Sequence, residues 1–131
     1  MTVTTDQANP SPETVARDYI NLWNETDAAR RGALLSRQWT AGATYVDPLA
    51  RAEGAGEIGA YIGGVHQRFP DYRFTLIGEA NGHGDHVRFR WSLGPAGAEA
   101  PIEGSDVLTL SGGRVAGVIG FLDKVPAPQP A

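Results

Sequence analysis

The stretch Ala43-Thr44-Tyr45-Val46-Asp47-Pro48 places a carboxylate at the end of a short strand. Its threonine, tyrosine and valine favour an extended backbone, because β-branched and aromatic side chains pack well on a pleated sheet. Pro48 pushes the residue before it into an extended conformation and ends the strand, since proline has no N–H to donate. We therefore predict a strand over residues 43–47 that presents Asp47 at the mouth of a sheet.

A first helix is predicted upstream of this strand. Ser11-Pro12 is a helix start, with a hydroxyl N-cap and a proline at the first helical position. Val15, Tyr19, Leu22 and Trp23 then follow at helical spacing and form one apolar stripe. Tyr19 is on that stripe, so its simplest interpretation is a core tyrosine whose hydroxyl finds a local partner.

Two further helices flank the predicted strand. Asp27 can cap the first of them, which extends to about residue 38. A glycine-rich loop is expected over residues 49–56, after the strand. Helical spacing resumes over residues 57–69, and Pro70 ends that helix.

From Asp71 onward, apolar residues recur at every second position instead of at helical spacing. The turn Asn81-Gly82-His83-Gly84-Asp85 predicts a hairpin, and two more strands are expected over 102–111 and 114–123. The last of these strands is apolar on both faces, so it is central or meets a partner subunit. Helices segregated from an antiparallel sheet indicate the α+β class, and a curled sheet covered by helices on one face encloses a cone-shaped cavity.

Length and composition indicate one globular domain. The chain has 131 residues, of which 41% are hydrophobic and 20% charged. We expect a flexible tail over residues 1–10, a folded domain over 11–124 and a disordered, proline-rich tail over 125–131.

The charge balance and the cysteine count exclude several functions. A net charge of −4 without any basic run argues against nucleic-acid binding. The absence of cysteine excludes disulfides, thiolate catalysis and cysteine-bound metals. Because no secretory signal and no apolar run of membrane-spanning length is evident, we expect a cytoplasmic protein that does not bind membranes.

The most informative polar residue is Asp106. Alternation along residues 102–110 places it on the apolar face of its strand, where an ionised carboxylate needs a partner or a raised pKa. Two interpretations are open: a structural aspartate that binds backbone amides or the first helix, or a functional group. Asp47 taken alone is equally consistent with a simple turn residue at the end of a strand.

The sequence resembles the NTF2-like superfamily, in particular its SnoaL-like and ketosteroid-isomerase-like branches, over about residues 15–123. The resemblance rests on the stretch from Asp18 to Asp27 (DYINLWNETD), on the strand ending in Asp47-Pro48, on Phe69-Pro70-Asp71, and on Gly104-Ser105-Asp106 followed by Gly113-Arg114-Val115. It implies an NTF2-like cone, in which three N-terminal helices and a short strand pack on a strongly curved antiparallel sheet. We also expect a homodimer that forms through the open face of the sheet.

The resemblance also implies a chemistry. In ketosteroid isomerases a tyrosine on the first helix and a protonated aspartic acid bind the enolate oxygen, and a second aspartate, before a proline, is the general base. Carried over, Tyr19 is that tyrosine, Asp106 the protonated acid and Asp47 the base. SnoaL-like polyketide cyclases instead use one late-strand aspartate as acid and base, a role that also suits Asp106.

The leading expectation is therefore a cofactor-independent isomerase or polyketide cyclase that acts on a hydrophobic carbonyl compound. The alternative is a non-catalytic, small-molecule-binding domain with the same pocket. We expect the hydrophobic ligand pocket to include His66, Phe89, Trp91 and Phe121. His66 has a second interpretation, as a helix-end residue near its own carbonyls, and the scattered histidines give no sign of a metal site.

Overall fold

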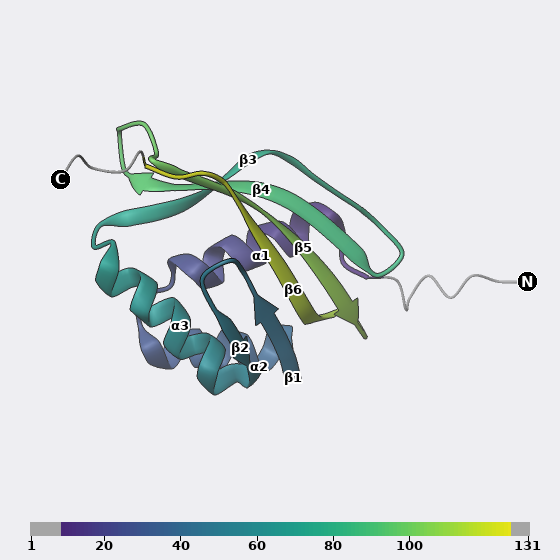
Figure 1. Cartoon of the computed structure of the whole chain (residues 1–131). Coiled ribbons are helices and arrows are strands. Elements are labelled where there is room, and N and C mark those ends of the chain that lie inside the picture. Colours follow the sequence, from purple (N-terminus) through teal and green to yellow (C-terminus); the bar gives the residue numbers. More distant parts are fainter. Residues whose placement is uncertain (1–8, 127–131) are drawn as a thin grey trace, which may run out of the picture.

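Three helices cover one side of a strongly bent sheet (Figure 1). The computed structural model describes residues 9–126. The elements in chain order are α1 (Pro12–Asn24), α2 (Ala28–Gln38), β1 (Trp39–Val46), β2 (Arg51–Glu53), α3 (Gly54–Arg68), β3 (Tyr72–His83), β4 (His86–Pro95), β5 (Ile102–Ser111) and β6 (Arg114–Lys124). This arrangement is the predicted α+β, NTF2-like fold.

Helices α1 and α2 begin at the predicted caps. The Ser11 hydroxyl accepts a hydrogen bond from the backbone N–H of Thr14 at 3.1 Å, and the Asp27 carboxylate accepts one from Arg30 at 2.9 Å. Each bond satisfies a backbone donor that has no partner inside the helix. The apolar stripe of α1 is buried, so the helix presents Tyr19 and Trp23 to the sheet.

The region around residues 43–48 contains more strand and helix than predicted. Strand β1 starts at Trp39, directly after α2, and the expected loop over residues 49–56 contains the short strand β2. This strand pairs antiparallel with β1, Tyr45 lying opposite Ala52. Helix α3 begins at Gly54, three residues earlier than predicted. Pairing between β1 and β2 is a tertiary interaction, so residue preferences within the glycine-rich stretch do not reveal it.

Strands β3 to β6 form the predicted meander, and the sheet order is β2-β1-β6-β5-β4-β3. All neighbouring strands are antiparallel except β1 and β6, which are parallel. The last strand was predicted to be central or to meet a partner subunit. Strand β6 lies between β1 and β5, so it is central in the sheet order, but Ile119 leaves its outer face exposed. The end of β1, which Asp47 follows, lies beside β6 in the sheet.

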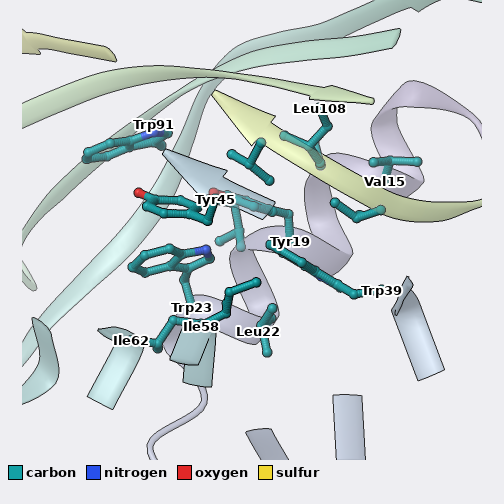
Figure 2. Packing of buried hydrophobic residues seen from close by; sticks show 14 of the residues in the cluster. Val15, Tyr19, Leu22, Trp23, Trp39, Tyr45, Ile58, Ile62, Trp91 and Leu108 are labelled. Carbon is teal, nitrogen blue, oxygen red and sulfur yellow. The ribbon is translucent and has the colours of Figure 1, made fainter. Parts of the chain in front are cut away.

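The core fills the space between the helices and the concave face of the sheet. Figure 2 shows Tyr19, Trp23, Tyr45 and Trp91 among its buried side chains. Among the described helices, none is long and apolar enough to cross a membrane. Asn9, at the end of the predicted N-terminal tail, donates to the Gly84 carbonyl at 3.0 Å. Residues 1–8 of that tail, and residues 127–131 of the C-terminal one, lie outside the described residues.

Candidate functional site

A cavity of about 230 Å³ opens between α1, α3 and the concave face of the sheet. Aromatic and aliphatic side chains form most of its wall. Among the described residues that line it, only Asp47 and Asp106 carry a charge. A small apolar cavity with a few converging polar groups is the usual form of a ligand site.

Asp106 lies on β5 at the inner end of the cavity and is only 3% exposed. The Tyr19 hydroxyl donates to its Oδ2 at 2.5 Å, and the Trp91 indole N–H donates to its Oδ1 at 3.1 Å. Burial raises the pKa of Asp106 to about 6, and the two hydrogen bonds oppose that shift because they favour the ionised form. The carboxyl group can therefore take up or release a proton near neutral pH.

The two acidic residues both lie next to Gly120. Asp106 pairs with Gly120 on β6, and β6 in turn lies beside β1, which Asp47 directly follows. A Cβ atom at Gly120 would lie 2.9 Å from the Asp106 Oδ1 atom and 3.3 Å from the Asp47 Cβ atom. The missing side chain thus leaves open the space that lies between the two acidic residues.

Asp47 is held by four hydrogen bonds. The backbone amides of Leu49 and Ala50 donate to its Oδ1 at 2.7 and 2.8 Å. The hydroxyls of Tyr45 and Tyr61 donate to its Oδ2 at 2.6 and 2.8 Å. A carboxylate has about four acceptor sites, so these donors occupy its hydrogen-bonding capacity.

Three tyrosines surround the carboxylates as neutral donors. Burial is the main cause that raises the pKa of Tyr19, of Tyr45 and of Tyr61 above the usual range, and the nearby aspartates raise it further. Each hydroxyl therefore keeps its proton throughout the neutral range. Their rings pack around Trp23, whose centroid lies 5.6 Å from that of Tyr45 and 6.0 Å from that of Tyr61.

The Trp23 indole nitrogen is buried and has no hydrogen-bond partner within residues 9–126. The backbone carbonyl of Trp23 lies 2.6 Å from the Nε2 atom of His66. The histidine is therefore bound to the end of α1, and it does not line the cavity.

The remaining residues expected in the pocket divide into two groups. Trp91 and the half-exposed Phe121 line the cavity. Phe89 does not: it is buried in the core, where its ring packs edge-on against Tyr19 at a centroid distance of 5.1 Å. Phe89 also lies opposite Asp106 on the paired strand β5, so it contacts Tyr19 next to the residue to which Tyr19 donates its hydrogen bond.

Sequence reasoning did not identify Tyr45 and Tyr61 as site residues. Tyr45 precedes Asp47 by two positions, and residues two apart share one face of a strand, so this signal was present. Tyr61 gave no such signal, because its contact with Asp47 depends on how α3 packs against β1. Among the described ion pairs, none joins Asp47 to Arg51 or to another arginine.

Comparison with solved structures identifies several similar folds. A proposed isomerase of the SnoaL-like family from Agrobacterium tumefaciens is 42% identical, covers 84% of this chain and 95% of its own, and has a TM-score of 0.81. A proposed ketosteroid isomerase from Kribbella flavida is 19% identical, covers 96% of this chain and 84% of its own, and has a TM-score of 0.66. A proposed polyketide cyclase from Sinorhizobium meliloti is 18% identical, covers 82% of this chain and 93% of its own, and has a TM-score of 0.65.

The last two structures, at such low identity, show the fold alone. The comparison with curated proteins finds no match. The family model for the SnoaL-like domain matches residues 16–118, which include Tyr19, Asp47 and Asp106. With this match over most of the chain and a relative of 42% identity, the protein belongs to the SnoaL-like domain family.

Proposed function

We propose that this protein is a cofactor-independent acid/base catalyst, an isomerase or cyclase that acts on a hydrophobic carbonyl compound. The observation that carries the proposal is Asp106: a buried carboxyl group with a pKa of about 6, at the wall of an apolar cavity, held by Tyr19 and Trp91. A general base or acid is most efficient when its pKa is close to the working pH.

In the proposed reaction, the ionised Asp106 removes a proton from the carbon next to the substrate carbonyl. The resulting enolate oxygen needs a hydrogen-bond donor, and the hydroxyls of Tyr45 and Tyr61 line the same cavity. A phenol has one O–H to donate, so one of these hydroxyls turns from Asp47 to the enolate oxygen in this step, and Asp47 keeps its three other donors. Protonated Asp106 then returns the proton to another carbon, which gives an isomer. In the cyclase variant the enolate carbon attacks a second carbonyl group of the same molecule, and Asp106 gives its proton to the new alkoxide.

The geometry favours Asp106 over Asp47 as the group that moves the proton. Asp106 accepts two hydrogen bonds, which leaves acceptor sites free, whereas Asp47 accepts four. Before it could accept a proton from carbon, Asp47 would have to lose one of its donors. We propose that Asp47 instead fixes Tyr45 and Tyr61 at the cavity. The arrangement in which Asp47 is the base and a protonated Asp106 binds the enolate oxygen is the competing version.

The size of the cavity limits the substrate. Ligand pockets commonly have about 300–1,000 Å³, and this cavity has about 230 Å³. The substrate is therefore small, or one end of it projects through the mouth past Leu49 and Val125, both of which are exposed and line the cavity. The lining supports a neutral ligand rather than an anion, because the described lining residues include two carboxylates and no basic side chain.

Enone isomerisation provides the test, with wild type, Asp106→Asn and Asp47→Asn compared under the same conditions. Loss of a general acid or base costs about 10²–10⁴-fold in rate. We expect a loss of this size in kcat for Asp106→Asn and a smaller loss for Asp47→Asn. The reverse order would favour the competing version, and equal rates in all three proteins would remove both carboxylates from the chemistry.

The second candidate function is a non-catalytic domain that binds a small hydrophobic molecule in the same cavity. The observation that favours it is the full hydrogen-bonding of Asp47, which is typical of a structural turn residue. Quenching of tryptophan fluorescence reports on binding, because Trp23 and Trp91 line the cavity. Saturable quenching by an enone that is never converted supports this candidate against the catalytic one.

A further inference from the structure

We infer that Gly104 and Trp91 are positioning residues for Asp106. The missing side chain at Gly104 allows the Trp91 indole to lie across β5 and donate its N–H to the carboxylate. Neither the match to the family model nor the similar structures assigns a role to this pair. The inference deepens the proposed function and rests on it for the catalytic consequence, but the geometry can be tested without any substrate.

The strand register brings the three residues together. Trp91 on β4 is directly opposite Gly104 on β5, and Asp106 follows two positions later on the same face of that strand. The side chain of Trp91 therefore has to extend along the surface of β5 to reach Asp106. Its Nε1 atom donates to the Asp106 Oδ1 atom at 3.1 Å.

Space for this path exists only because residue 104 is glycine. A Cβ atom there would lie 2.7 Å from the Trp91 Cε2 atom and even closer to Cζ2, well inside van der Waals contact. On the other side, the same Cβ would lie 2.6 Å from the backbone oxygen of Phe121. That oxygen belongs to β6, which is paired with β5, so the backbone cannot give way easily. Any larger residue therefore displaces the indole.

Displacement of the indole removes one of the two hydrogen bonds that favour ionised Asp106. The other titratable groups that act on Asp106 from the surrounding elements are all acids: Tyr19 on α1, Tyr45 on β1, Asp47 after β1, Tyr61 on α3 and Asp123 on β6. The arginines of β4, Arg88 and Arg90, alternate with Phe89 and Trp91 and lie exposed on the opposite face. No described basic group thus compensates for the lost donor, and Asp106 holds its proton to higher pH.

The test follows the titration of Asp106 by carbon-13 NMR of the aspartate carboxyl groups in the full chain. The Asp106→Asn variant identifies the Asp106 signal, because that signal disappears. We expect Gly104→Ala to raise the pKa of Asp106 by about one unit, since hydrogen bonds to charged groups are among the stronger ones. Trp91→Phe, which removes the N–H and adds no methyl group, should raise it by a similar amount.

The double variant separates a positioning role from a general disturbance. If Gly104 acts through the Trp91 N–H, adding Gly104→Ala to Trp91→Phe raises the pKa no further. Gly117→Ala is the matched control, because its methyl group would meet only the Thr44 hydroxyl at 3.4 Å, and it should leave the titration unchanged. An unchanged Asp106 pKa in Trp91→Phe overturns the inference even if Gly104→Ala does not fold, and additive shifts in the double variant overturn it as well.

The outcomes for this inference and for the proposed function are distinct. A shifted titration in a protein that converts no carbonyl compound supports the positioning roles and rejects the proposed catalysis. If the protein is active, the acidic limb of its pH–rate profile should shift to higher pH in Gly104→Ala, by the same amount as the measured pKa of Asp106. An active protein whose profile stays in place while the pKa moves would show that Asp106 is not the group that limits the rate.

Discussion

Ionisation of Asp106 should make the folded protein less stable as the pH rises, and replacement by asparagine should remove this effect. The pKa of Asp106 is raised from its usual 3.8 to about 6, chiefly by burial. Between these two values the folded state binds more protons than the unfolded state. Stability contributed by protonation is therefore fully present below about 3.8 and is lost as the pH rises through about 6.

The size of the effect follows from the shift. One pKa unit corresponds to about 1.4 kcal/mol, so complete ionisation costs the folded protein about 3 kcal/mol relative to the unfolded chain. Most of this, about 2 kcal/mol, should be lost between about pH 4.5 and about pH 8. Asp106 is 3% exposed, so little of this cost is screened by solvent.

Urea denaturation of wild type and Asp106→Asn at the two pH values measures this contribution. Other acidic groups also titrate in this range, so the informative quantity is the difference in unfolding free energy between the two proteins. That difference should shift in favour of Asp106→Asn by about 2 kcal/mol as the pH is raised. A difference that is the same at both pH values, or that shifts in favour of wild type, would refute the argument that burial dominates at this site.

Two other predictions concern the cavity floor and the outer face of the sheet. Gly120→Ala should lower kcat/KM for enone isomerisation by at least about tenfold, because the methyl group would lie 2.9 Å from the Asp106 Oδ1 atom and 3.3 Å from the Asp47 Cβ atom; an unchanged rate would mean that the space between the carboxylates is not used. We also propose that the side chain of Ile119, which is 54% exposed and alternates with the buried Val118 on β6, forms part of a homodimer interface on the outer face of the sheet. Sedimentation should then give a dimer for wild type and a monomer for Ile119→Arg, whereas a monomeric wild type would contradict this proposal.

Much of the fold was predictable from local features of the chain. The caps at Ser11 and Asp27 and the two-residue alternation of the long strands gave the helices, the meander and the α+β class, because these signals depend on residues close together in sequence. The alternation also marked Asp106 as a polar residue on an apolar face. The short strand β2 and the early start of α3 were missed, since the pairing of β2 with β1 is a tertiary contact.

The sequence by itself determined that the stretch over residues 43–48 ends in a carboxylate, and it marked Asp106 as a polar residue on an apolar face. The roles expected of Tyr19 and Asp47 came from the resemblance to ketosteroid isomerases. Tertiary structure alone decided how the two carboxylates differ. Asp47 sits in a turn whose amides, with two tyrosines from β1 and α3, satisfy four acceptor sites. Asp106 is buried with only two donors, and its pKa rises. Desolvation and hydrogen bonding are set by neighbours that are distant in sequence, so only the packed chain can assign these properties.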